Sequence, residues 1–441
     1  MPITYKQVRE IPVRYNTEVL VVGGGLTGVC AAVAAAEMGE EVILVERNGR
    51  CGGNFTSSLV STFCAYHVIE DGEDKPVSGG LAERIFTHLQ NKDSVGQFIY
   101  HSSAPVVPVD GPVLIRFLDE MLMNAGVKVL FHQTASDVVM ENNRVKAVLF
   151  TEKGGEYAIQ CKTVIDCTGD GDVASMTGIP VLTDNPVTQF PSLVFHIGGV
   201  DFEKASKLKK PDLEKLQKQV VESGEFDLPR TDGTLSLMPR QGIVQANLGL
   251  IKIGSRPISA LNSEDMSYGQ IEGRRQAFMY LDFVRKHIPG YENAFICKFP
   301  ITVGIRETRR MRGSYILTKD DFLAARKFND GIACSSWPIE LHREKDLVWV
   351  HLPPGEYLEV PFRCLVPEDV ENLLFAGRCL SADQNAHAAV RCGPTCMSMG
   401  EAAGIGAATL SKNAGKAAKD LDGSAIRKIM RERGAHFPKD V

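Results

Sequence analysis

Apolar residues occur in short, uninterrupted runs near the start of the chain, separated by glycine-rich and polar segments. The first two runs are Val19–Val22 and Val42–Val45, and mostly small residues lie between them up to Gly39. Runs of about four to eight apolar residues are typical of strands that are buried on both faces of a sheet. We therefore expect a strand, a helix and a second strand between Glu18 and Arg47.

The pattern changes in the middle of the chain, from about residue 185 to residue 342. There, residues 201–224 predict a charged surface helix interrupted at Pro211, and residues 270–287 have the periodicity of an amphipathic helix. Elsewhere the pattern predicts a helix over 114–125, strands over 127–131, 163–167 and 372–377, a hairpin of 138–140 with 145–150, and a small-residue helix over 394–410.

A glycine turn separates the first strand from the helix, and an acidic residue ends the second strand. The turn reads Gly23-Gly24-Gly25-Leu26-Thr27-Gly28, and Glu46 lies 18 residues after it. Gly23 permits the tight turn, Gly25 lets backbone N–H groups approach a diphosphate at the helix N-terminus, and Gly28 lets helix and strand pack closely. The Glu46 carboxylate can accept hydrogen bonds from a ribose diol. This order of elements predicts an adenine-dinucleotide site.

Length and composition place the chain among ordinary globular proteins. Its 441 residues exceed a single core, so two domains are expected, and 44% hydrophobic with 23% charged residues is typical of soluble folds. A net charge of −5 without a long basic block argues against nucleic acid or an anionic membrane as the main partner. Residues 19–36 carry no charge and are long enough for a membrane span. The three consecutive glycines and the acidic end of the second strand favour the strand–helix–strand interpretation instead. With no signal-peptide pattern, we expect a cytoplasmic protein.

Cysteine and histidine spacing argues against a redox disulfide and a metal site. The 11 cysteines include no Cys-x-x-Cys pair and many lie in apolar runs, so reduced, buried thiols are expected. Cys392 and Cys396 are four residues apart, but a disulfide-reductase pair normally follows the glycine turn after the second strand. Cys51 and Cys64 lie near that turn, yet their separation of 13 residues does not match the short redox spacing. The 10 histidines are dispersed, and no metal site is expected.

Segments that follow the second strand indicate which dinucleotide the protein binds. Cys51-Gly52-Gly53-Asn54 is a second glycine turn, a third strand ends in Thr168-Gly169-Asp170, and a C-terminal strand ends in Ala376-Gly377-Arg378. Together with the run Gly304-Ile305-Arg306-Glu307-Thr308-Arg309-Arg310 and the segment 376–382, they resemble the FAD-dependent oxidoreductases with the two-dinucleotide-binding, glutathione reductase-like Rossmann fold. The resemblance covers nearly the whole chain and implies FAD rather than NAD as the cofactor.

The resemblance also implies which residues contact FAD. Many relatives have an acid at the position of Arg378, and an arginine cannot accept the hydrogen bonds of the ribityl hydroxyls. The implied residues lie in the two glycine turns, at strand ends, near the predicted hairpin and at the start of the last long helix. They are Gly23, Gly25, Leu26, Thr27, Gly28, Glu46, Arg47, Gly52, Gly53, Asn54, Ala135, Thr168, Gly169, Asp170, Gly377, Arg378, Thr395 and Cys396.

The segment 387–396 is similar to a stretch of the fumarate reductase and succinate dehydrogenase flavoproteins. There, a histidine and an arginine four residues apart hold a substrate carboxylate, and the next backbone amides cradle the flavin. Carried over, His387 and Arg391 contact the substrate, while Thr395 and Cys396 face the flavin. Two structural alternatives stay open: Arg391 can pair with a nearby acid, and His387 can be a satisfied core residue.

The arginine-rich run and one later histidine supply further candidates. Arg306 and Arg310 are four residues apart and share a face in a helix or a strand. Such a pair predicts either a clamp on a carboxylate or an interdomain salt-bridge network. We favour the clamp for Arg306 and the network for Arg309 and Arg312. His342 can serve as a general base or acid.

The sequence therefore predicts an α/β protein: an FAD-binding Rossmann-type domain, residues 1–183 and 346–441, with an inserted α+β substrate domain, residues 184–345. We expect an FAD-dependent oxidoreductase that moves a hydride between flavin N5 and a small polar substrate, carboxylate-bearing or hydroxylated. No second dinucleotide unit is evident, so an external electron donor or acceptor is expected. The alternatives are an NAD-dependent dehydrogenase and a non-catalytic flavin-binding redox sensor, and a homo-oligomer is compatible with the sequence.

Overall fold

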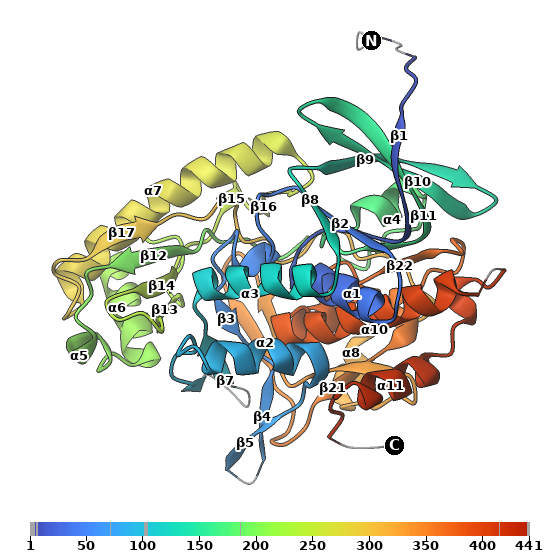
Figure 1. Cartoon of the computed structure of the whole chain (residues 1–441). Helices are drawn as coiled ribbons and strands as arrows, with labels where there is room; N and C mark the ends of the chain where they lie inside the picture. The colour runs from blue at the N-terminus through green and yellow to red at the C-terminus, as the bar shows by residue number, and fades with distance from the viewer. Residues whose placement is uncertain are drawn as a thin grey trace.

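The computed structural model of the chain consists of two packed bodies, a larger one around a mostly parallel sheet and a smaller one around an antiparallel sheet (Figure 1). It describes residues 5, 8–70, 72–100, 105–185, 187–413 and 415–438.

The larger body is built on a seven-stranded sheet of order β8-β2-β1-β11-β10-β9, with β22 added beside the end of β11. Strands β8, β2, β1, β11 and β22 are parallel, whereas β9, β10 and the first half of β11 form an antiparallel meander. The strands are β1 (Val13–Val22), β2 (Val42–Glu46), β8 (Lys128–Phe131), β9 (Thr134–Glu141), β10 (Arg144–Glu152), β11 (Gly155–Asp166) and β22 (Leu373–Phe375).

The predicted apolar runs form the buried middle of this sheet, as expected. The last four residues of β1 and all of β2 are buried, and Val21 pairs with Leu44 on one side and Ile165 on the other. Because the strands are parallel, Glu46 and Asp166 end at the same edge of the sheet. In open α/β sheets that edge is where ligands bind.

The predicted hairpin and the helix before β8 are also confirmed. Asn142 and Asn143 connect β9 to β10 with φ of 49° and 60°, the positive values that a two-residue hairpin turn requires. Helix α3 (Gly111–Asn124) begins at Asp110, whose side chain accepts a hydrogen bond from the Val113 amide.

Helices α1 (Leu26–Glu37) and α10 (Gly393–Ser411) pack against each other at very close range, and both are almost entirely buried. A Cβ atom on Gly400 would lie 2.1 Å from the Thr27 carbonyl oxygen, and one on Gly404 would lie 2.2 Å from that of Ala31. The other helices of this body are α2 (Gly80–Gln90), α3, α4 (Asp172–Met176), α8 (Lys319–Leu323), α9 (Gln384–Val390) and α11 (Gly423–Glu432), with 3-10 turns at Gly53–Phe55, Phe362–Leu365 and Ala418–Asp420.

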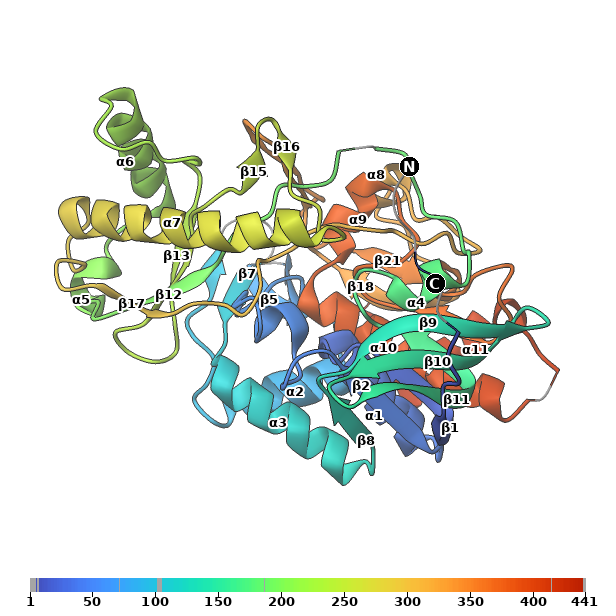
Figure 2. The ribbon, with the colours of Figure 1, turned by 90° about the horizontal axis from the view of Figure 1, so that it is seen from above.

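The smaller body has its own core around a four-stranded antiparallel sheet of order β13-β14-β12-β17. The charged helix predicted around Pro211 is in fact two helices, and Pro211 lies in the first turn of the second. In the first turn of a helix the backbone N–H groups have no intrahelical acceptor, so the missing N–H of proline costs no hydrogen bond there. Figure 2 shows the long helix α7 running from the larger body out over this sheet. The elements are β12 (Phe195–Gly198), β13 (Thr234–Leu237), β14 (Val244–Asn247), β17 (Phe295–Lys298), α5 (Phe202–Ala205), α6 (Lys210–Glu222) and α7 (Ser263–His287).

Short antiparallel ribbons connect the two bodies and cover the larger one. The domain division predicted at residue 345 lies in the turn between two of these paired strands, β19 and β20. The division remains a prediction. The ribbon strands are β3 (Thr62–Phe63), β4 (His67–Glu70), β5 (Glu73–Pro76), β6 (Ile99–Tyr100), β7 (Pro105–Pro108), β15 (Lys252–Ile253), β16 (Arg256–Pro257), β18 (Gly331–Ser335), β19 (Ile339–His342), β20 (Leu347–Val350) and β21 (Leu358–Pro361).

The charge-free stretch from residue 19 to residue 36 forms the end of β1, the glycine turn and α1. Within the described ranges, we find no helix with the length and hydropathy needed to cross a bilayer.

We expect Gly404→Ala to destabilise the protein. Alanine favours a helix over glycine by about 1 kcal/mol, but overpacking of a close interface costs about 1–3 kcal/mol, and here the added methyl would meet the α1 backbone. Urea unfolding followed by circular dichroism measures the difference. The control is Gly111→Ala, because the new methyl group there would lie 3.8 Å from its nearest neighbour, Ser61 Oγ. Equal stability of the two variants would contradict the close packing of α1 on α10.

Candidate functional site

The first glycine turn leaves the start of helix α1 without any side-chain cap. Gly23 has a φ of +103°, and a Cβ there would lie 2.4 Å from the Cys167 carbonyl oxygen, so only glycine fits beside β11. Gly25 is the N-cap of α1 and supplies no side-chain hydrogen bond. The first N–H groups of α1 are therefore available to an anion.

The second glycine turn lies directly on the first. The Gly52 amide donates to the Gly24 carbonyl oxygen at 2.8 Å, and a Cβ on Gly53 would lie 3.0 Å from the Gly25 Cα. Asn54 follows and donates from its side chain to the Ile305 carbonyl oxygen at 3.2 Å. Two turns that follow different strands thus form one wall of backbone.

Glu46 ends β2 beside these turns. Its carboxylate accepts hydrogen bonds from the Gly24 amide at 2.7 Å and from the Asn48 amide at 2.8 Å, and it is buried. The Asn48 side-chain amide also donates to the carboxylate, at 2.7 Å. A carboxylate has about four lone-pair positions, so acceptor capacity remains for one hydroxyl of a ribose diol.

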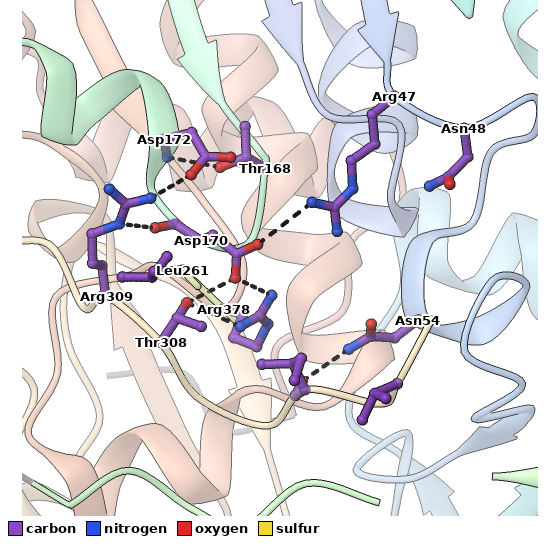
Figure 3. Close-up of polar contacts among 12 residues, drawn as sticks. Arg47, Asn48, Asn54, Thr168, Asp170, Asp172, Leu261, Thr308, Arg309 and Arg378 are labelled. Carbon is purple, nitrogen blue, oxygen red and sulfur yellow. Dashed lines mark hydrogen bonds and ion pairs between the residues drawn. The ribbon is translucent and has the colours of Figure 1, made fainter. Parts of the chain in front are cut away.

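Asp170, after β11, is the centre of an arginine network (Figure 3). Its Oδ1 accepts hydrogen bonds from Thr308 Oγ1 at 2.8 Å and from Arg378 Nη2 at 2.7 Å, and Arg47 Nη1 lies 3.9 Å from Oδ2. Burial alone would raise the pKa of Asp170, but the charges of Arg378 and Arg47 hold it below its ordinary value. Arg378 is therefore the partner of a nearby carboxylate.

These elements enclose a cavity that we call the glycine groove, of about 130 Å³. Asp170 lines an adjoining cavity, together with Arg47, Asn54 and Arg378. The predicted cofactor residues that line the groove itself are Gly23, Gly25, Leu26, Thr27, Glu46, Arg47, Gly52, Gly53, Asn54, Thr168, Gly169, Arg378 and Cys396.

Four predicted cofactor residues lie elsewhere. Gly28 and Gly377 pack beneath the turn, since a Cβ on Gly377 would lie 2.7 Å from Thr27 Oγ1. Thr395 is buried and donates from its hydroxyl to the Cys334 carbonyl oxygen at 2.9 Å. Ala135 lies in β9, against the core beneath the meander, and it is absent from the lining of the groove.

A second cavity, of about 190 Å³, lies between the two bodies and meets the groove. Arg230, Arg306 and Arg391 all line it, and we call it the arginine cavity. Asn54, Phe55, Arg391 and Gly393 line both the cavity and the groove.

Arg306 and Arg391 face this cavity with mostly neutral partners. Arg306 Nη1 donates to the Phe190 carbonyl oxygen at 2.8 Å and to Ser192 Oγ at 3.1 Å. Burial, with the charges of Arg230 and Arg391, pushes the pKa of Arg306 down to about 9, but a guanidinium keeps its proton in proteins. Arg391 lies 4.0 Å from Glu340 Oε2, and among the described residues its buried Nε has no partner.

Glu340 and His342 form a pair at the side of the arginine cavity. The distance from His342 Nε2 to Glu340 Oε1 is 3.0 Å. Burial, then the charge of Arg306, holds the pKa of His342 well below its ordinary value in spite of Glu340. The pKa of Glu340 is also below its ordinary value, because His342 and Arg391 outweigh its burial. The imidazole is thus neutral and the carboxylate ionised.

His387 differs from the sequence-based expectation of a residue that contacts substrate. It is fully buried, its Nε2 lies 2.8 Å from the Arg378 carbonyl oxygen, and it lines neither the glycine groove nor the arginine cavity. This placement matches the alternative of a core histidine, because helix α9 places the His387 side chain against the backbone of Arg378.

The arginine-rich run is neither helix nor strand but an irregular segment between the bodies. Arg309 bonds the Asp170 carbonyl oxygen at 2.7 Å and also pairs with Asp172. Arg310 pairs with Glu307 at 3.1 Å. Of the arginines in this run, Arg306 alone lines the arginine cavity. Sequence reasoning did not single out Arg230, Asp232 or Glu340, because no local motif marks them and only the contact of the two bodies brings them together.

The family of the chain follows from a comparison with known families. A family model described as FAD dependent oxidoreductase matches residues 18–430. The chain belongs to this family. It is therefore an oxidoreductase whose cofactor is FAD, and the glycine groove suits that cofactor, because α1 and α10 both begin beside it without capping side chains.

Curated relatives of the oxidoreductase match it only in part. Digeranylgeranylglycerophospholipid reductase of Methanosarcina acetivorans is 27% identical over 190 residues, which cover 42% of this chain and 46% of that protein. Thiamine thiazole synthase of Aeropyrum pernix is 30% identical over 268 residues, which cover 55% of this chain and 89% of that protein. The oxidoreductase thus spans about half the length of the reductases that it matches.

Solved structures resemble the oxidoreductase distantly. A geranylgeranyl bacteriochlorophyll reductase-like protein of Thermoplasma acidophilum aligns with 95% of this chain and 83% of its own, with 16% identity and a TM-score of 0.46. GidA of Aquifex aeolicus aligns with 96% of this chain and 69% of its own, with 15% identity and a TM-score of 0.48. Neither likeness is close enough to bear on activity.

We expect Gly53→Ala to weaken FAD binding by about tenfold or more, because the methyl group would enter the space between the two glycine turns. The dissociation constant is measured by titrating the apoprotein with FAD and following flavin fluorescence. The matched control is Gly178→Ala, which also has a positive φ (+86°) but open space around its Cβ, so it carries the same backbone strain without the obstruction. Equal FAD affinity of the two variants would contradict the proposal that the glycine groove binds the cofactor.

Proposed function

We propose that this oxidoreductase moves a hydride between a carbon of a small, carboxylate-bearing or hydroxylated substrate and N5 of bound FAD. The substrate lies in the arginine cavity, between the two bodies. The observation that carries this proposal is the convergence of Arg230, Arg306 and Arg391 on one cavity that meets the glycine groove. An external electron donor or acceptor completes the cycle.

The glycine groove is the proposed position of FAD. The α1 N-terminus binds the diphosphate, Glu46 accepts hydrogen bonds from the ribose, and the α10 N-terminus lies at the flavin end, beside the arginine cavity. FAD supplies the redox chemistry when bound. The proposed contact residues are Gly23, Gly25, Leu26, Thr27, Gly28, Glu46, Arg47, Gly52, Gly53, Asn54, Thr168, Gly169, Asp170, Gly377, Arg378 and Cys396.

The charges around the arginine cavity favour an anionic ligand. Arg230 pairs with Asp232, and Arg391 lies near Glu340, but Arg306 contacts only neutral groups among the residues that the structure describes. Glu340 and Asp232 act on Arg306 electrostatically, but neither forms a direct ion pair with it among the described residues. A desolvated guanidinium without a direct ion pair is costly, and a carboxylate is its best-matched partner. Arg306 and Arg391 would orient such a carboxylate from two sides.

His342 is the proposed group for holding or moving a proton. Because Glu340 is ionised, the proton of the neutral imidazole lies on Nε2 and is donated to Glu340, and Nδ1 is left as an acceptor. A neutral imidazole with a free acceptor can take a proton from a substrate hydroxyl. Glu340 fixes the ring and stabilises the imidazolium that would form.

The pairing of the strands supports an external electron partner. Parallel strands occur only in the sheet of the larger body among the described sheets, and all other pairings are antiparallel. A dedicated NAD(P)H domain of the strand–helix–strand type is therefore absent from the described part of the chain.

The names of the relatives, a digeranylgeranylglycerophospholipid reductase and a thiamine thiazole synthase, differ too much to select a substrate.

We expect Arg391→Met to weaken carboxylate binding by about tenfold or more, because a hydrogen bond to a charged group contributes about 1.5–3 kcal/mol. The holoenzyme is titrated with succinate, malonate and lactate while the FAD absorbance is followed. Arg343→Met serves as control, because Arg343 is exposed and does not line the arginine cavity. The proposal fails if none of the three anions perturbs the spectrum, or if both variants bind as tightly as the unmodified protein.

The pH dependence of carboxylate binding tests the state of His342. An ordinary histidine would lose its positive charge as pH rises through about 6.5, and anion affinity would then fall. Because the pKa of His342 lies well below that value, the ring is already neutral, and the affinity should stay flat between about pH 6 and 8. The same titration, repeated at several pH values, measures this. A fall near pH 6.5 that His342→Gln abolishes would show a charged imidazole instead.

A further inference from the structure

Two cysteines that are far apart in the sequence meet at the wall of the arginine cavity. The sulfur atoms of Cys64 and Cys392 lie 3.3 Å apart, although 328 residues separate them. Both residues line the arginine cavity. Cys392 is the N-cap of α10, and the next residue, Gly393, lines the glycine groove as well. The pair therefore lies where the two cavities meet.

Apolar side chains pack around the two sulfur atoms. Ala65, Val106 and Trp337 form a small apolar cluster with Cys392, and Cys64 packs against it. A disulfide bond is about 2.05 Å long, so closing the pair requires an approach of roughly 1.3 Å, which rotation of the two side chains can supply. Cys396, by contrast, lines the groove but directs its thiol to the Val390 carbonyl oxygen.

The two thiols differ in accessibility. Cys64 is half-buried and Cys392 is buried. Burial, and the contact with Cys64, raises the pKa of the Cys392 thiol well above its ordinary value. An external thiol therefore meets Cys64 first, and Cys392 is the thiol that is released when Cys64 enters a mixed disulfide with it.

We propose that Cys64 and Cys392 are a redox-active dithiol that passes two electrons from a small external dithiol to FAD. Both S–H bonds break and one S–S bond forms, and the two electrons and two protons go to FAD. The external dithiol then opens the Cys64–Cys392 disulfide by exchange and leaves as a disulfide. The proposal rests on the position of FAD given above, and not on the identity of the substrate.

The first test is whether the disulfide forms. The holoenzyme is equilibrated with an excess of oxidised glutathione, remaining thiols are alkylated, and peptides are identified by mass spectrometry. We expect a cross-linked peptide that joins Cys64 to Cys392, while the exposed Cys297 is alkylated. Alkylation of both Cys64 and Cys392 after this treatment would overturn the proposal. This measurement involves no carboxylate, so failure of the substrate assignment would leave it unaffected.

The second test is whether the pair delivers electrons. Reduced dithiothreitol is added anaerobically, and the loss of flavin absorbance is followed. We expect Cys64→Ser and Cys392→Ser to bleach at least about tenfold more slowly while FAD stays bound, since both remove the exchange step. Serine is a preferred N-cap residue, so Cys392→Ser keeps the start of α10. Cys297→Ser is the matched control and should bleach at the unmodified rate. Equal bleaching of all three variants would overturn electron transfer through the pair.

Discussion

The backbone of one glycine turn lies on the backbone of another, and this contact shapes the groove beside which the other groups of the site lie. The Gly52 amide donates to the Gly24 carbonyl oxygen, and a Cβ on Gly53 would lie 3.0 Å from the Gly25 Cα. A side chain on either surface would separate β1 and α1 from the segment that follows β2. Because none is present at the two turns, backbone N–H groups are accessible there, and a diphosphate can approach them closely.

A second close contact connects the groove to the end of the chain. Helix α10 packs on α1 through Gly400 and Gly404, where backbone meets backbone. This packing fixes the start of α10 at the junction of the glycine groove and the arginine cavity. Arg391 and Cys392, which precede the helix, take their positions from it. The geometry of the proposed chemistry thus depends on two glycines well inside the helix that touch no ligand.

The arginines of the site fall into two groups that differ in their partners. Arg378 and Arg309 surround Asp170 and Asp172, and their charges are neutralised within the protein. Arg306, from the same run as Arg309, contacts only a carbonyl oxygen and a hydroxyl among the described residues. Arginines that are paired in this way have their charge compensated by the protein, whereas an arginine without a direct ion pair favours an anionic ligand. Arginines of one segment therefore have two roles: Arg309 pairs with acidic residues of the protein, and Arg306 is available to a ligand.

The sequence by itself determined the α/β fold and the first strand–turn–helix unit, because each depends on residues that are neighbours in the chain. The turn at Asn142–Asn143 is predictable for the same reason: its backbone angles belong to those two residues. FAD was implied by the resemblance of several separate segments to one family. Only the tertiary structure placed His387 in the core, brought Arg230 to the cavity and set Cys64 against Cys392. These positions depend on how helices and sheets pack across hundreds of residues, and no local period or spacing records that packing.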